Sequence, residues 1–525
     1  MQVLLWHFFI MVKTLRRNYL IAVLSVFCGC ASIDFDHPKT ASTALPPEQT
    51  TDTNLGRMLE GLADAHPGQA GFFPVADGVE ALAIRLLMAE QAEHSIDTQY
   101  YLIKDDLVGH LFIESLLRAA DRGVRVRLLV DDIKTKGYDA GMAALNSHPN
   151  FEVRVFNPFA RRSARLVDGV TSFARVNRRM HNKSFTVDNQ MMLIGGRNIA
   201  DEYFAARLDV SFGDLDVVGI GPVVADVSEM FDVFWNSRAA VPVTAFTEAP
   251  DNPDEALSQL REQAARTRAE ASESKYADAV RSSMLETIRQ DLSIFAWASY
   301  QLVYDSPDKW QRKKAKDAAS IRTPLIEAFD NAKKEVLIIS PYFVPRSTGI
   351  ARFQELRDRG VDVRVVTNSL AATNQSFVHG GYTPSRKPLL KMGVKLYEVR
   401  ADASVAGHER VGSDADKITL HTKAFAIDRE RLFIGSFNFD PRSAYINTEM
   451  GVIINSPELA GDFVTRGDEA IRHKTYAVFR NENGALRWRG LEDDKEVILT
   501  KEPQTGFWQR FVAGFMRLLP IRGQL

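Results

Sequence analysis

Two segments of this chain carry the same five chemical groups at the same spacing. "HNKSFTVDNQMMLIGGRN" begins at His181, and "HTKAFAIDRERLFIGSFN" begins at His421. In both segments histidine, lysine, aspartate, glycine and asparagine stand at identical offsets, which coincidence does not readily produce. A repeat of this kind predicts that the chain folds as two similar units. With 525 residues, both units have room for a substantial core.

The residues before each copy predict the same order of elements. Apolar residues at helical spacing alternate with short apolar runs typical of buried strands, so each unit should contain parallel strands covered by helices. The predicted helices are residues 78–94, 107–123, 320–334 and 349–360, and the predicted strands are 95–103, 124–132, 335–343 and 361–370. The sequence "DRGV" occurs at corresponding places, at Asp121 and Asp358. The fold class is therefore α/β, with two tandem domains.

Composition shifts divide the chain into six segments. The predicted segments are a signal or lipoprotein-type N-terminus (1–30), a tether with scattered Pro, Thr, Asp and Ala (31–70), the first domain (71–245), a helical insertion or linker (246–318), the second domain (319–475) and a C-terminal extension with an amphipathic tail (476–525).

The N-terminus has the pattern of an export signal. Basic residues precede the apolar run "YLIAVLSVFCGCAS", which is shorter than the roughly 20 residues of a membrane-spanning helix. Residues 29–32 resemble the end of a bacterial lipoprotein signal, in which Cys30 becomes the lipidated first residue, although Phe27 departs from the small aliphatic residue usual there. An uncleaved N-terminal anchor is the alternative. Both interpretations predict an exported, membrane-associated protein of the bacterial cell envelope.

The C-terminal tail "GFWQRFVAGFMRLLPIRGQL" predicts an amphipathic helix. Its apolar residues fall near one helical face, with arginines among them: Phe507, Trp508, Phe511, Val512, Phe515, Leu518 and Leu519. Such a helix either lies on a membrane surface or docks on its own domain, and the sequence leaves both open.

Each copy of the motif predicts a β-hairpin. His181 and Lys183 are two residues apart, so on a strand both side chains leave the same face. Asp188 has the opposite parity and falls in a turn-like stretch, so we assign it and its counterpart Asp428 to structure.

The return strand of the hairpin should bring a glycine and an asparagine to the histidine. If residues 188–190 form the turn, Val187 pairs with Met191 and Asn198 arrives beside the histidine. Gly195, and Gly435 in the second copy, leave room for a ligand to approach the backbone.

Each copy thus offers one imidazole, one ammonium and one amide, which suit a phosphate diester. An imidazole can attack phosphorus, while ammonium and amide donors neutralise charge on the non-bridging oxygens. One histidine cannot easily be both the nucleophile and the acid for the leaving group. If the units pack about a pseudo-two-fold axis, two histidines can stand in line on opposite sides of one phosphorus. The duplication therefore predicts one shared active site.

Composition limits the other possibilities. Lys plus Arg is 65 and Asp plus Glu is 67, a formal charge of −2, so no general attraction for nucleic acid is expected. The two cysteines, Cys28 and Cys30, both precede the folded body, which excludes a disulfide framework or thiolate cluster there. No HExxH or P-loop occurs, and lysines stand where carboxylates would be needed to hold a metal. We expect no metal and no cofactor.

The duplicated pattern HxKxxxxDxxxxxxGxxN resembles the phospholipase D superfamily. This resemblance covers about residues 71–454. Within the superfamily, "HPGQAGFFP", "NRRMHNKSFTVD", "GGRNIADEYF", "GSFNFDPRSAYINTEMG" and "KEPQTGFW" resemble the bacterial cardiolipin synthases of the C type. The resemblance implies two phospholipase-D-like α/β/α sandwich domains packed about a pseudo-two-fold axis, with one shared active site.

The resemblance also implies roles for the motif residues. His181 would be the nucleophile that forms a phosphohistidine and His421 the acid and later base, although the family allows the reverse. The groups that would hold the phosphoryl oxygens are Lys183, Lys423, Asn198 and Asn438, with Ser436 assisting.

A carboxylate normally orients each histidine of such a pair. By resemblance Glu449, in "NTEMG", takes this role in the second half. In the first half "GDLDVVGIGP" contains two acids, and the resemblance of "DVVGIGP" to the family favours Asp216, with Asp214 as the alternative.

The implied activity is transfer of a phosphatidyl group to phosphatidylglycerol, which makes cardiolipin, with phosphatidylethanolamine or phosphatidylglycerol as donor. The alternatives are an exported phospholipase D that releases phosphatidic acid, a nucleic-acid phosphodiesterase, and a non-catalytic lipid-binding scaffold. The expected partners are phospholipids and the membrane, and the resemblance leaves room for a small partner protein.

Overall fold

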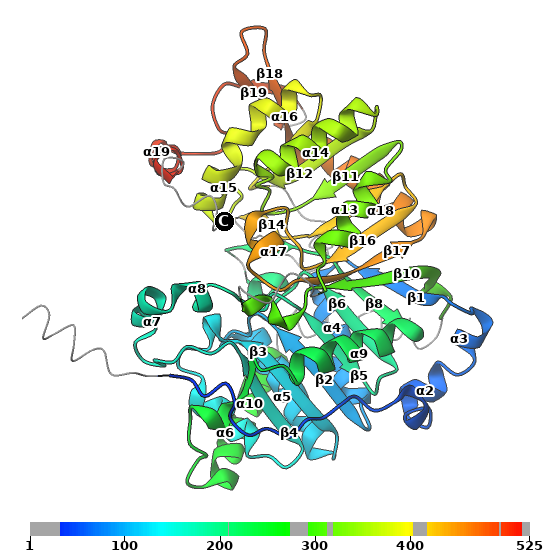
Figure 1. Ribbon diagram of the computed structural model, residues 1–525, viewed down its shortest axis with the longest axis vertical. Coiled ribbons are helices and arrows are strands. Elements are labelled where there is room, and N and C mark those ends of the chain that lie inside the picture. The colour runs from blue at the N-terminus through cyan, green and yellow to red at the C-terminus, as the bar shows by residue number, and fades with distance from the viewer. Residues whose placement is uncertain are drawn as a thin grey trace, which may run out of the picture.

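The two halves of the chain form two α/β bodies that lie one above the other (Figure 1). The computed structural model describes residues 32–207, 209–272, 292–311, 319–402, 417–492 and 495–516. The proposed signal segment with Cys30, and residues 517–525 of the tail, lie outside the described residues.

The first body is built on a mixed sheet in the order β1-β8-β6-β5-β2-β3-β4-β9. Its neighbours β2, β3 and β4 run parallel, and the other pairs are antiparallel. The strands are β1 (Ala70–Val75), β2 (Ser95–Tyr100), β3 (Arg125–Asp131), β4 (Phe151–Phe156), β5 (Ser184–Val187), β6 (Met191–Gly195), β8 (Asp216–Ile220) and β9 (Ala240–Pro242).

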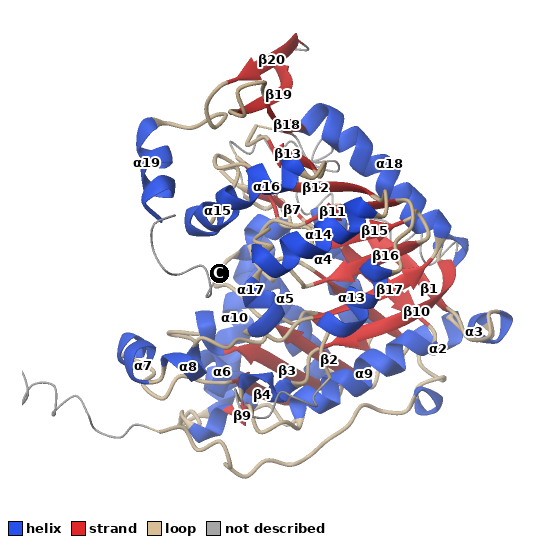
Figure 2. Cartoon of the chain, turned by 45° about the horizontal axis from the view of Figure 1, so that its top comes forward, coloured by secondary structure: helices blue, strands red, loops and turns tan. Residues whose placement is uncertain are grey.

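Helices cover both faces of this sheet (Figure 2). One core cluster packs α4, α5 and α6 on one face, and a second packs α9 on the other. The helices are α2 (Asn54–Met58), α3 (Leu62–Ala65), α4 (Gly78–Gln91), α5 (Leu107–Asp121), α6 (Asp139–Asn146), α7 (Arg165–Thr171), α8 (Phe173–Val176), α9 (Pro222–Trp235) and α10 (Pro253–Ser272), with 3-10 turns η1 (Pro47–Gln49), η2 (Asp132–Lys134), η3 (Asp201–Tyr203) and η4 (Val243–Ala245).

The second body repeats this plan with the strand order β10-β17-β16-β15-β11-β12-β13-β18-β19-β20. Here β11, β12 and β13 are the parallel strands. The strands are β10 (Ala296–Tyr304), β11 (Glu335–Ile339), β12 (Asp362–Asn368), β13 (Lys395–Val399), β15 (Ala424–Ile427), β16 (Arg431–Gly435), β17 (Met450–Asn455), β18 (Thr475–Arg480), β19 (Leu486–Glu492) and β20 (Lys495–Leu499).

The helices of the second body also cover both faces of its sheet. One cluster packs α13, α14 and α16, while α18 joins the cluster that contains α9 of the first body, so one core runs through the domain interface. The helices are α13 (Arg322–Asp330), α14 (Arg346–Asp358), α15 (Ser376–Tyr382), α16 (Arg386–Lys391), α17 (Pro441–Tyr445), α18 (Pro457–Lys474) and α19 (Phe507–Met516), with 3-10 turns η5 (Leu292–Ile294), η6 (Pro307–Trp310) and η7 (Thr383–Ser385).

The predicted helix–strand–helix–strand order appears in both halves, as α4-β2-α5-β3 and α13-β11-α14-β12. Both "DRG" segments end a helix in the way that their sequence suggests. Gly123 has φ +98° and Gly360 has φ +82°, left-handed values that close the helix without a side-chain clash. The two-domain α/β prediction is confirmed.

Two of the predicted connecting segments differ from expectation. The predicted helical linker 246–318 contains α10, but also the strand β10, which pairs with β1 and with β17 and so joins the two sheets. The interpretation of this whole segment as helical is therefore wrong. The β10 sequence AWASYQLVY is rich in the aromatic and branched residues that favour strands, and pairing with two sheet edges stabilises it.

The described part of the predicted tether lies along the first body. Lys39 Nζ donates to the carbonyl oxygen of Ala240 at 2.7 Å, and Trp235 Nε1 donates to Ser42 Oγ at 3.0 Å. Arg127 also donates to the Ser42 carbonyl oxygen at 2.8 Å. Residues 36–44 are thus a strap held to the first body by hydrogen bonds, and not the tether that we predicted.

Two short strands link the bodies directly. Strands β7 (Ser211–Gly213) and β14 (Ile418–Leu420) pair in parallel, one from each half of the chain. A single bridge between Met180 and Thr448 forms a second link of the same kind. Each link ends one residue before a histidine of the motif. Among the described residues, no helix combines the length and the apolar character needed to cross a membrane.

Candidate active site

The first motif histidine is placed by the bridge between Met180 and Thr448. The His181 backbone N–H donates to the Thr448 carbonyl oxygen at 2.9 Å, which brings the next residue, Glu449, beside the imidazole. His181 Nδ1 lies 2.8 Å from Glu449 Oε2. Ser436 Oγ donates to the same carboxylate oxygen at 2.5 Å and so holds it toward the ring.

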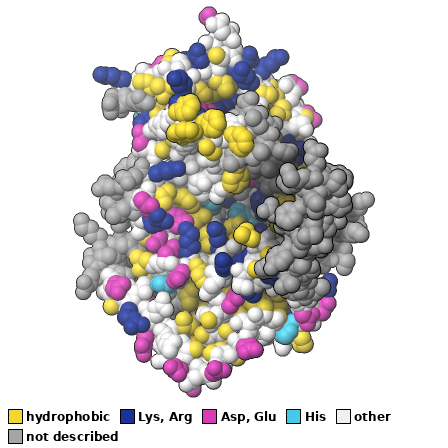
Figure 3. All heavy atoms as spheres, turned by 90° about the vertical axis from the view of Figure 1, so that its left-hand side faces the viewer, with side chains coloured by type: hydrophobic (Ala, Val, Ile, Leu, Met, Phe, Trp, Pro, Cys, Tyr) yellow, Lys and Arg dark blue, Asp and Glu magenta, His cyan; other side chains and the backbone are white. Residues whose placement is uncertain are grey.

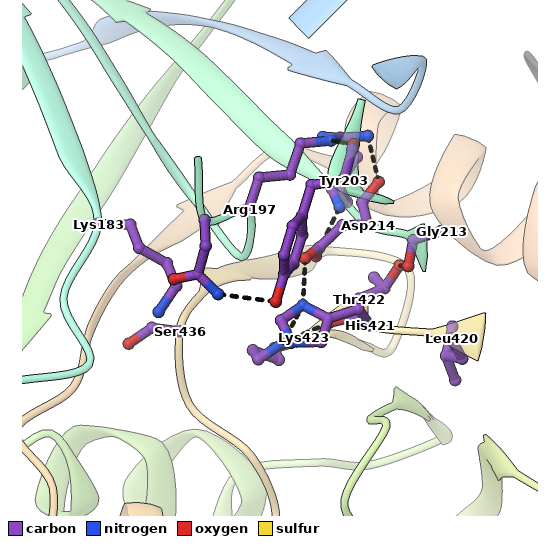
Figure 4. Close-up of polar contacts among 12 residues, drawn as sticks. Lys183, Arg197, Tyr203, Gly213, Asp214, Leu420, His421, Thr422, Lys423 and Ser436 are labelled. Carbon is purple, nitrogen blue, oxygen red and sulfur yellow. Dashed lines mark hydrogen bonds and ion pairs between the residues drawn. The ribbon is translucent and has the colours of Figure 1, made fainter. Parts of the chain in front are cut away.

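The second histidine is placed by the β7–β14 pair (Figure 4). His421 N–H donates to the Gly213 carbonyl oxygen at 2.7 Å, and His421 Nδ1 lies 2.5 Å from Asp214 Oδ2. Each histidine therefore faces a carboxylate from the opposite domain. This reciprocal arrangement leaves Nε2 as the reacting nitrogen of each ring.

The carboxylate beside His421 is Asp214, and our choice of Asp216 was wrong. Asp216 Oδ2 instead accepts from Arg85 at 2.9 Å and lies 3.2 Å from Arg197 NH1, with all three side chains buried. The physical reason is the register of the sheet, which pairs Asp216 with Gly195 and so turns it away from the histidine.

A comparison of the two hairpins could have found the right acid. In the second half Gly435 pairs with Gly451, two residues after Glu449. In the first half Gly195 pairs with Asp216, so the residue two positions earlier is Asp214. Gly196 supplies the space, because a Cβ there would lie 2.1 Å from Asp214 Oδ1.

The lysines of both copies and Asn198 of the first copy lie at this site. Lys183 Nζ donates to the His181 carbonyl oxygen at 2.6 Å, and Lys423 Nζ lies 2.8 Å from His421 Nδ1. Asn198 Nδ2 donates to the Tyr203 hydroxyl at 2.8 Å.

The side-chain carbonyl oxygens of the two motif asparagines share one feature. In the part of the chain that the structure describes, Asn198 Oδ1 and Asn438 Oδ1 are buried without a hydrogen-bond partner. A buried amide in equivalent positions of both copies is suited to a polar ligand.

The two aspartates of the motif serve the fold, as their parity suggests. Asp188 accepts hydrogen bonds from the backbone N–H groups of Glu93, His94 and Ser95, at 2.8–3.0 Å. Asp428 does the same for three consecutive residues, Lys333, Lys334 and Glu335. Both aspartates have positive φ, as a tight hairpin turn requires.

The predicted hairpin register is also present. Val187 pairs with Met191, and Gly195 closes the return strand β6. A Cβ on Gly195 would lie 2.6 Å from the Asp216 Cα, and one on Gly435 would lie 2.3 Å from the Met450 carbonyl oxygen. The missing side chains therefore let the neighbouring strand approach, and not a ligand as we predicted.

The family model described as "Cardiolipin synthase, PLD-like domain" matches residues 86–235 and 325–468, one match for each body. The chain belongs to this family. It is thus a cardiolipin synthase homologue within the phospholipase D superfamily and an enzyme of the transferase class, and the predicted resemblance is confirmed.

Relatives support this membership along nearly the full chain. Cardiolipin synthase C of Escherichia coli (strain K12) is 40% identical over 487 residues, 92% of this chain and 99% of the relative. An uncharacterized protein of Helicobacter pylori is 30% identical over 506 residues, 95% of this chain and 98% of its own. The crystal structure of phosphatidylserine synthase from Haemophilus influenzae Rd KW20 has the same fold, with a TM-score of 0.56 and 12% identity over 90% of this chain and 100% of that one.

Burial controls the charge of the two histidines of this family member. Burial lowers the pKa of His181 to about 4; Glu449 opposes this shift and Lys183 adds to it. Burial, with Lys423 acting in the same direction, lowers the pKa of His421 to about 3. Both imidazoles are therefore neutral near pH 7 in the free enzyme, as a nitrogen nucleophile must be.

The lysines and carboxylates respond to the same burial. Burial lowers the pKa of Lys183 to about 7 and that of Lys423 to about 8. For Asp214 burial acts to raise the pKa, but Lys423 and His421 outweigh it and the net shift is downward. Glu449 behaves alike, with His181 and Lys183 outweighing burial. The site thus holds two carboxylates as anions beside two lysines that lose their protons unusually easily.

Aromatic side chains form the walls of the site, and the sequence reasoning missed them. The Tyr101 ring lies edge-on to His181 with centroids 5.0 Å apart, and Tyr203 lies edge-on to His421 at the same distance. Phe212 stacks on His421 at 5.6 Å. These residues lie outside the repeated motif, so the signal for them was weak. Tyr101 stands near the end of the predicted strand 95–103, and Tyr203 stands in "GGRNIADEYF", one of the segments that carry the resemblance.

The described residues contain no group of three or more His, Cys, Asp and Glu side chains arranged to hold a metal ion. The acids at the site are instead engaged by histidine, with Glu449 on His181 and Asp214 on His421.

Proposed function

We propose that this protein is a membrane-associated phosphatidyltransferase that makes cardiolipin through a phosphohistidine intermediate. The observation that carries the proposal is the reciprocal support of the two histidines, with Glu449 of the second domain on His181 and Asp214 of the first domain on His421. Membership of the cardiolipin synthase family supports the choice of phospholipids as substrates.

In the first step, His181 Nε2 attacks the phosphorus of the donor phospholipid. A nitrogen–phosphorus bond forms, the bond from phosphorus to the headgroup oxygen breaks, and His421 gives that oxygen a proton. Glu449 stabilises the positive charge that develops on His181, and Ser436 keeps Glu449 in place. The donor is phosphatidylglycerol or phosphatidylethanolamine.

In the second step, His421 takes a proton from the primary hydroxyl of phosphatidylglycerol. That oxygen attacks phosphorus, the bond to His181 breaks, and cardiolipin leaves. The acid role requires a protonated His421, although the pKa of His421 is low in the free enzyme. A bound phosphate diester adds a negative charge beside the ring, and this charge raises the pKa toward the range that the acid needs.

The lysines and asparagines stabilise the charge on the transferring phosphorus. Lys183 and Lys423 supply positive charge, and the side-chain NH2 groups of Asn198 and Asn438 donate hydrogen bonds to the phosphoryl oxygens. Such groups lower the barrier because they are already oriented when charge develops on the phosphoryl oxygens.

Exclusion of water supports transfer over hydrolysis. His181 and His421 are only 8% and 4% exposed, and Tyr101, Tyr203 and Phe212 line them. A site of this kind disfavours water as acceptor and favours an alcohol held in a lipid.

Expression in bacteria that lack cardiolipin synthases, followed by mass spectrometry of total lipids, tests the function. The wild type should make cardiolipin, and His181→Ala and His421→Ala should each make none. A rise in phosphatidic acid without cardiolipin would identify a hydrolase. No lipid change at all would contradict phospholipid chemistry by this chain alone and point to a partner protein or another diester.

We also propose that residues 1–30 export the protein to the cell envelope and that Cys30 carries a lipid anchor. The sequence pattern around Cys30 supports this. Metabolic labelling with a fatty acid tests it: the label should enter the wild type and be absent from Cys30→Ser. Equal labelling of both would contradict the proposal.

A further inference from the structure

Large exposed hydrophobic side chains are concentrated on a few helices of this molecule. Among the described residues, those on α7, α8, α15, α17 and α19 are Leu166, Val170, Phe173, Phe377, Tyr445, Phe507, Trp508, Phe511, Val512 and Phe515. Val233 and Ile498 are the exceptions on other elements. Helices α7 and α8 of the first body and α15 and α19 of the second lie on the same side of the molecule in both ribbon views (Figures 1 and 2).

Figure 3 faces that side. Hydrophobic side chains gather in the upper part, histidine is visible in a hollow near the centre, and Lys and Arg side chains lie below the hollow. The hollow therefore opens on the same side of the molecule as the exposed helices.

Helices α7 and α8 directly precede the segment that carries His181. Helix α8 ends at Val176, five residues before His181. The Asn157 side chain donates to the carbonyl oxygens of Arg175 and Arg178 and so fixes this segment. On α7, Leu166 is 89% and Val170 is 83% exposed, and residues four apart share one helical face.

The last helix is connected to the second histidine in a similar way. Gln509 of α19 donates to the Leu370 carbonyl oxygen at 2.8 Å. In the same loop region, Asn368 bonds both the N–H and the carbonyl oxygen of Leu420, the residue before His421. Helix α19 also packs against α15, yet Trp508 remains 72% exposed.

From this arrangement we propose that α7–α8 and α15–α19 together form a docking face that seats the enzyme on a phospholipid bilayer, with the active-site opening turned toward the lipid. The inference deepens the proposed function and rests on it only for the activity measurement below. Apolar and aromatic side chains on short exposed helices are the groups that enter the boundary between headgroups and acyl chains.

A bilayer fits this face better than a protein partner does. The exposed hydrophobic side chains of α7–α8 and α15–α19 belong to different domains and lie on the side of the molecule where the hollow opens. A protein that bound across both would cover the opening, whereas a bilayer that bound there would deliver a diester to it.

Charge near the opening suits anionic headgroups. The segment 159–180 holds Arg161, Arg162, Arg165, Arg175, Arg178 and Arg179 and the single acid Asp168. Asp131 and Asp132 offset part of this charge by pairing with Arg179, Arg162 and Arg165. The remaining excess of positive charge favours a surface that contains phosphatidylglycerol.

Fluorescence of Trp508 in the full chain tests insertion directly. Trp235, Trp310 and Trp488 are buried and Trp297 is partly buried, so Trp508, at 72%, is the most exposed tryptophan among the described residues. Vesicles of phosphatidylethanolamine and phosphatidylglycerol with brominated acyl chains should quench the wild type, and Trp508→Phe should remove most of that quenching. Adding Phe173→Trp to Trp508→Phe should restore it, because α8 would enter the same surface.

Activity separates docking from chemistry. The double variant Val170→Asp, Trp508→Asp should lose at least tenfold of its transfer rate on vesicles but keep the wild-type rate in detergent–phospholipid micelles, where single lipids reach the site. The matched control is Val233→Asp, Ile498→Asp, whose side chains are 41% and 52% exposed on other elements, and it should match the wild type in both assays.

Quenching that is equal in wild type and Trp508→Phe would overturn the proposal, as would a control variant that loses vesicle activity to the same extent as the docking variant. A docking variant that loses its rate equally in micelles would also overturn it. Quenching that persists in His181→Ala would show that docking holds even if the proposed chemistry fails. An unquenched Trp508 together with loss of a protein complex in the docking variant would identify a protein interface instead.

Discussion

Replacing Asp214 or Asp216 by asparagine should have different effects: the Asp214 variant should lose activity, and the Asp216 variant should lose stability. Asp214→Asn keeps the shape of a buried side chain but removes the negative charge that lies 2.5 Å from His421 Nδ1. That charge matters most when His421 is an imidazolium, which is the state that protonates the leaving group. The loss should therefore appear in kcat more than in KM.

The magnitude follows from the burial of the pair. The side chains of His421 and Asp214 are 5% and 0% exposed, so water cannot replace the lost charge. Removing one partner of a buried ion pair costs about 3–5 kcal/mol. At about 1.36 kcal/mol for each tenfold change in rate, kcat should fall by about 10²- to 10⁴-fold.

Asp216→Asn is the matched control, because its carboxylate pairs with Arg85 and Arg197 and not with a histidine. It should lower the free energy of unfolding by about 3–5 kcal/mol, since it leaves buried guanidinium groups without their charge partner. The remaining folded protein should keep its kcat within a few fold.

The assay is cardiolipin formation by purified protein in mixed micelles, with unfolding by urea measured on the same samples. Asp214→Asn with more than a third of the wild-type kcat would refute the reasoning. So would Asp216→Asn with unchanged stability and a hundredfold lower kcat, because that result would return the orienting role to Asp216.

Other substitutions and conditions test the rest of the site. In the folded protein the pKa values of His181 and His421, about 4 and about 3, lie below the ordinary 6.5, so the unfolded chain binds more protons between these values. The free energy of unfolding should therefore fall as the pH drops from about 6.5 to about 4. Urea unfolding at several pH values measures this free energy, and a value that does not change with pH would contradict the prediction. Because the pKa of Lys183 is about 7, the transfer rate should decline above about pH 7 as the Lys183 ammonium loses its proton. In Lys183→Arg, the pH–rate profile should show this decline at a higher pH. A decline at the same pH in this variant would mean that another group causes it. Gly196→Ala puts a Cβ 2.1 Å from Asp214 Oδ1 and should lower the transfer rate at least tenfold. Gly461→Ala is the control, because its Cβ meets nothing within 4 Å, and it should keep the wild-type rate. Equal rates in the two variants would show that Asp214 can move without loss of activity. Asp188→Ala leaves three backbone N–H groups unpaired and should lower the free energy of unfolding by about 3 kcal/mol or more with kcat unchanged, so a stable but inactive variant would argue for a catalytic Asp188.

In the first hairpin, the local sequence pattern predicted some features of the site correctly and others wrongly. The parity of His181 and Asp188 separated the residues of the site from the residue of the turn, because alternation along a strand is a property of the backbone alone. The same reasoning misread Gly195, whose missing side chain accommodates a neighbouring strand. Which object fills the space beside a glycine depends on the partner strand, and the sequence does not name that partner.

The identity of the acid beside His421 could be decided only with the strand pairings of the folded protein. Asp214 and Asp216 have the same chemistry and the same parity, so neither of these two properties separates them. The register of β6 against β8 and the pairing of β7 with β14 make the choice, and both bring together residues far apart in the chain.

The sequence by itself determined the duplication, the order of helices and strands, the kit of groups for a phosphate diester and the family. These follow from spacing, which local backbone geometry converts directly into structure. Tertiary structure alone decided that each histidine takes its carboxylate from the other domain, that β10 joins the two sheets, and that α7 and α19 lie on one side of the molecule. Those contacts arise because two sheets and two loops meet across a shared core, and their energies depend on burial and register that no local segment contains.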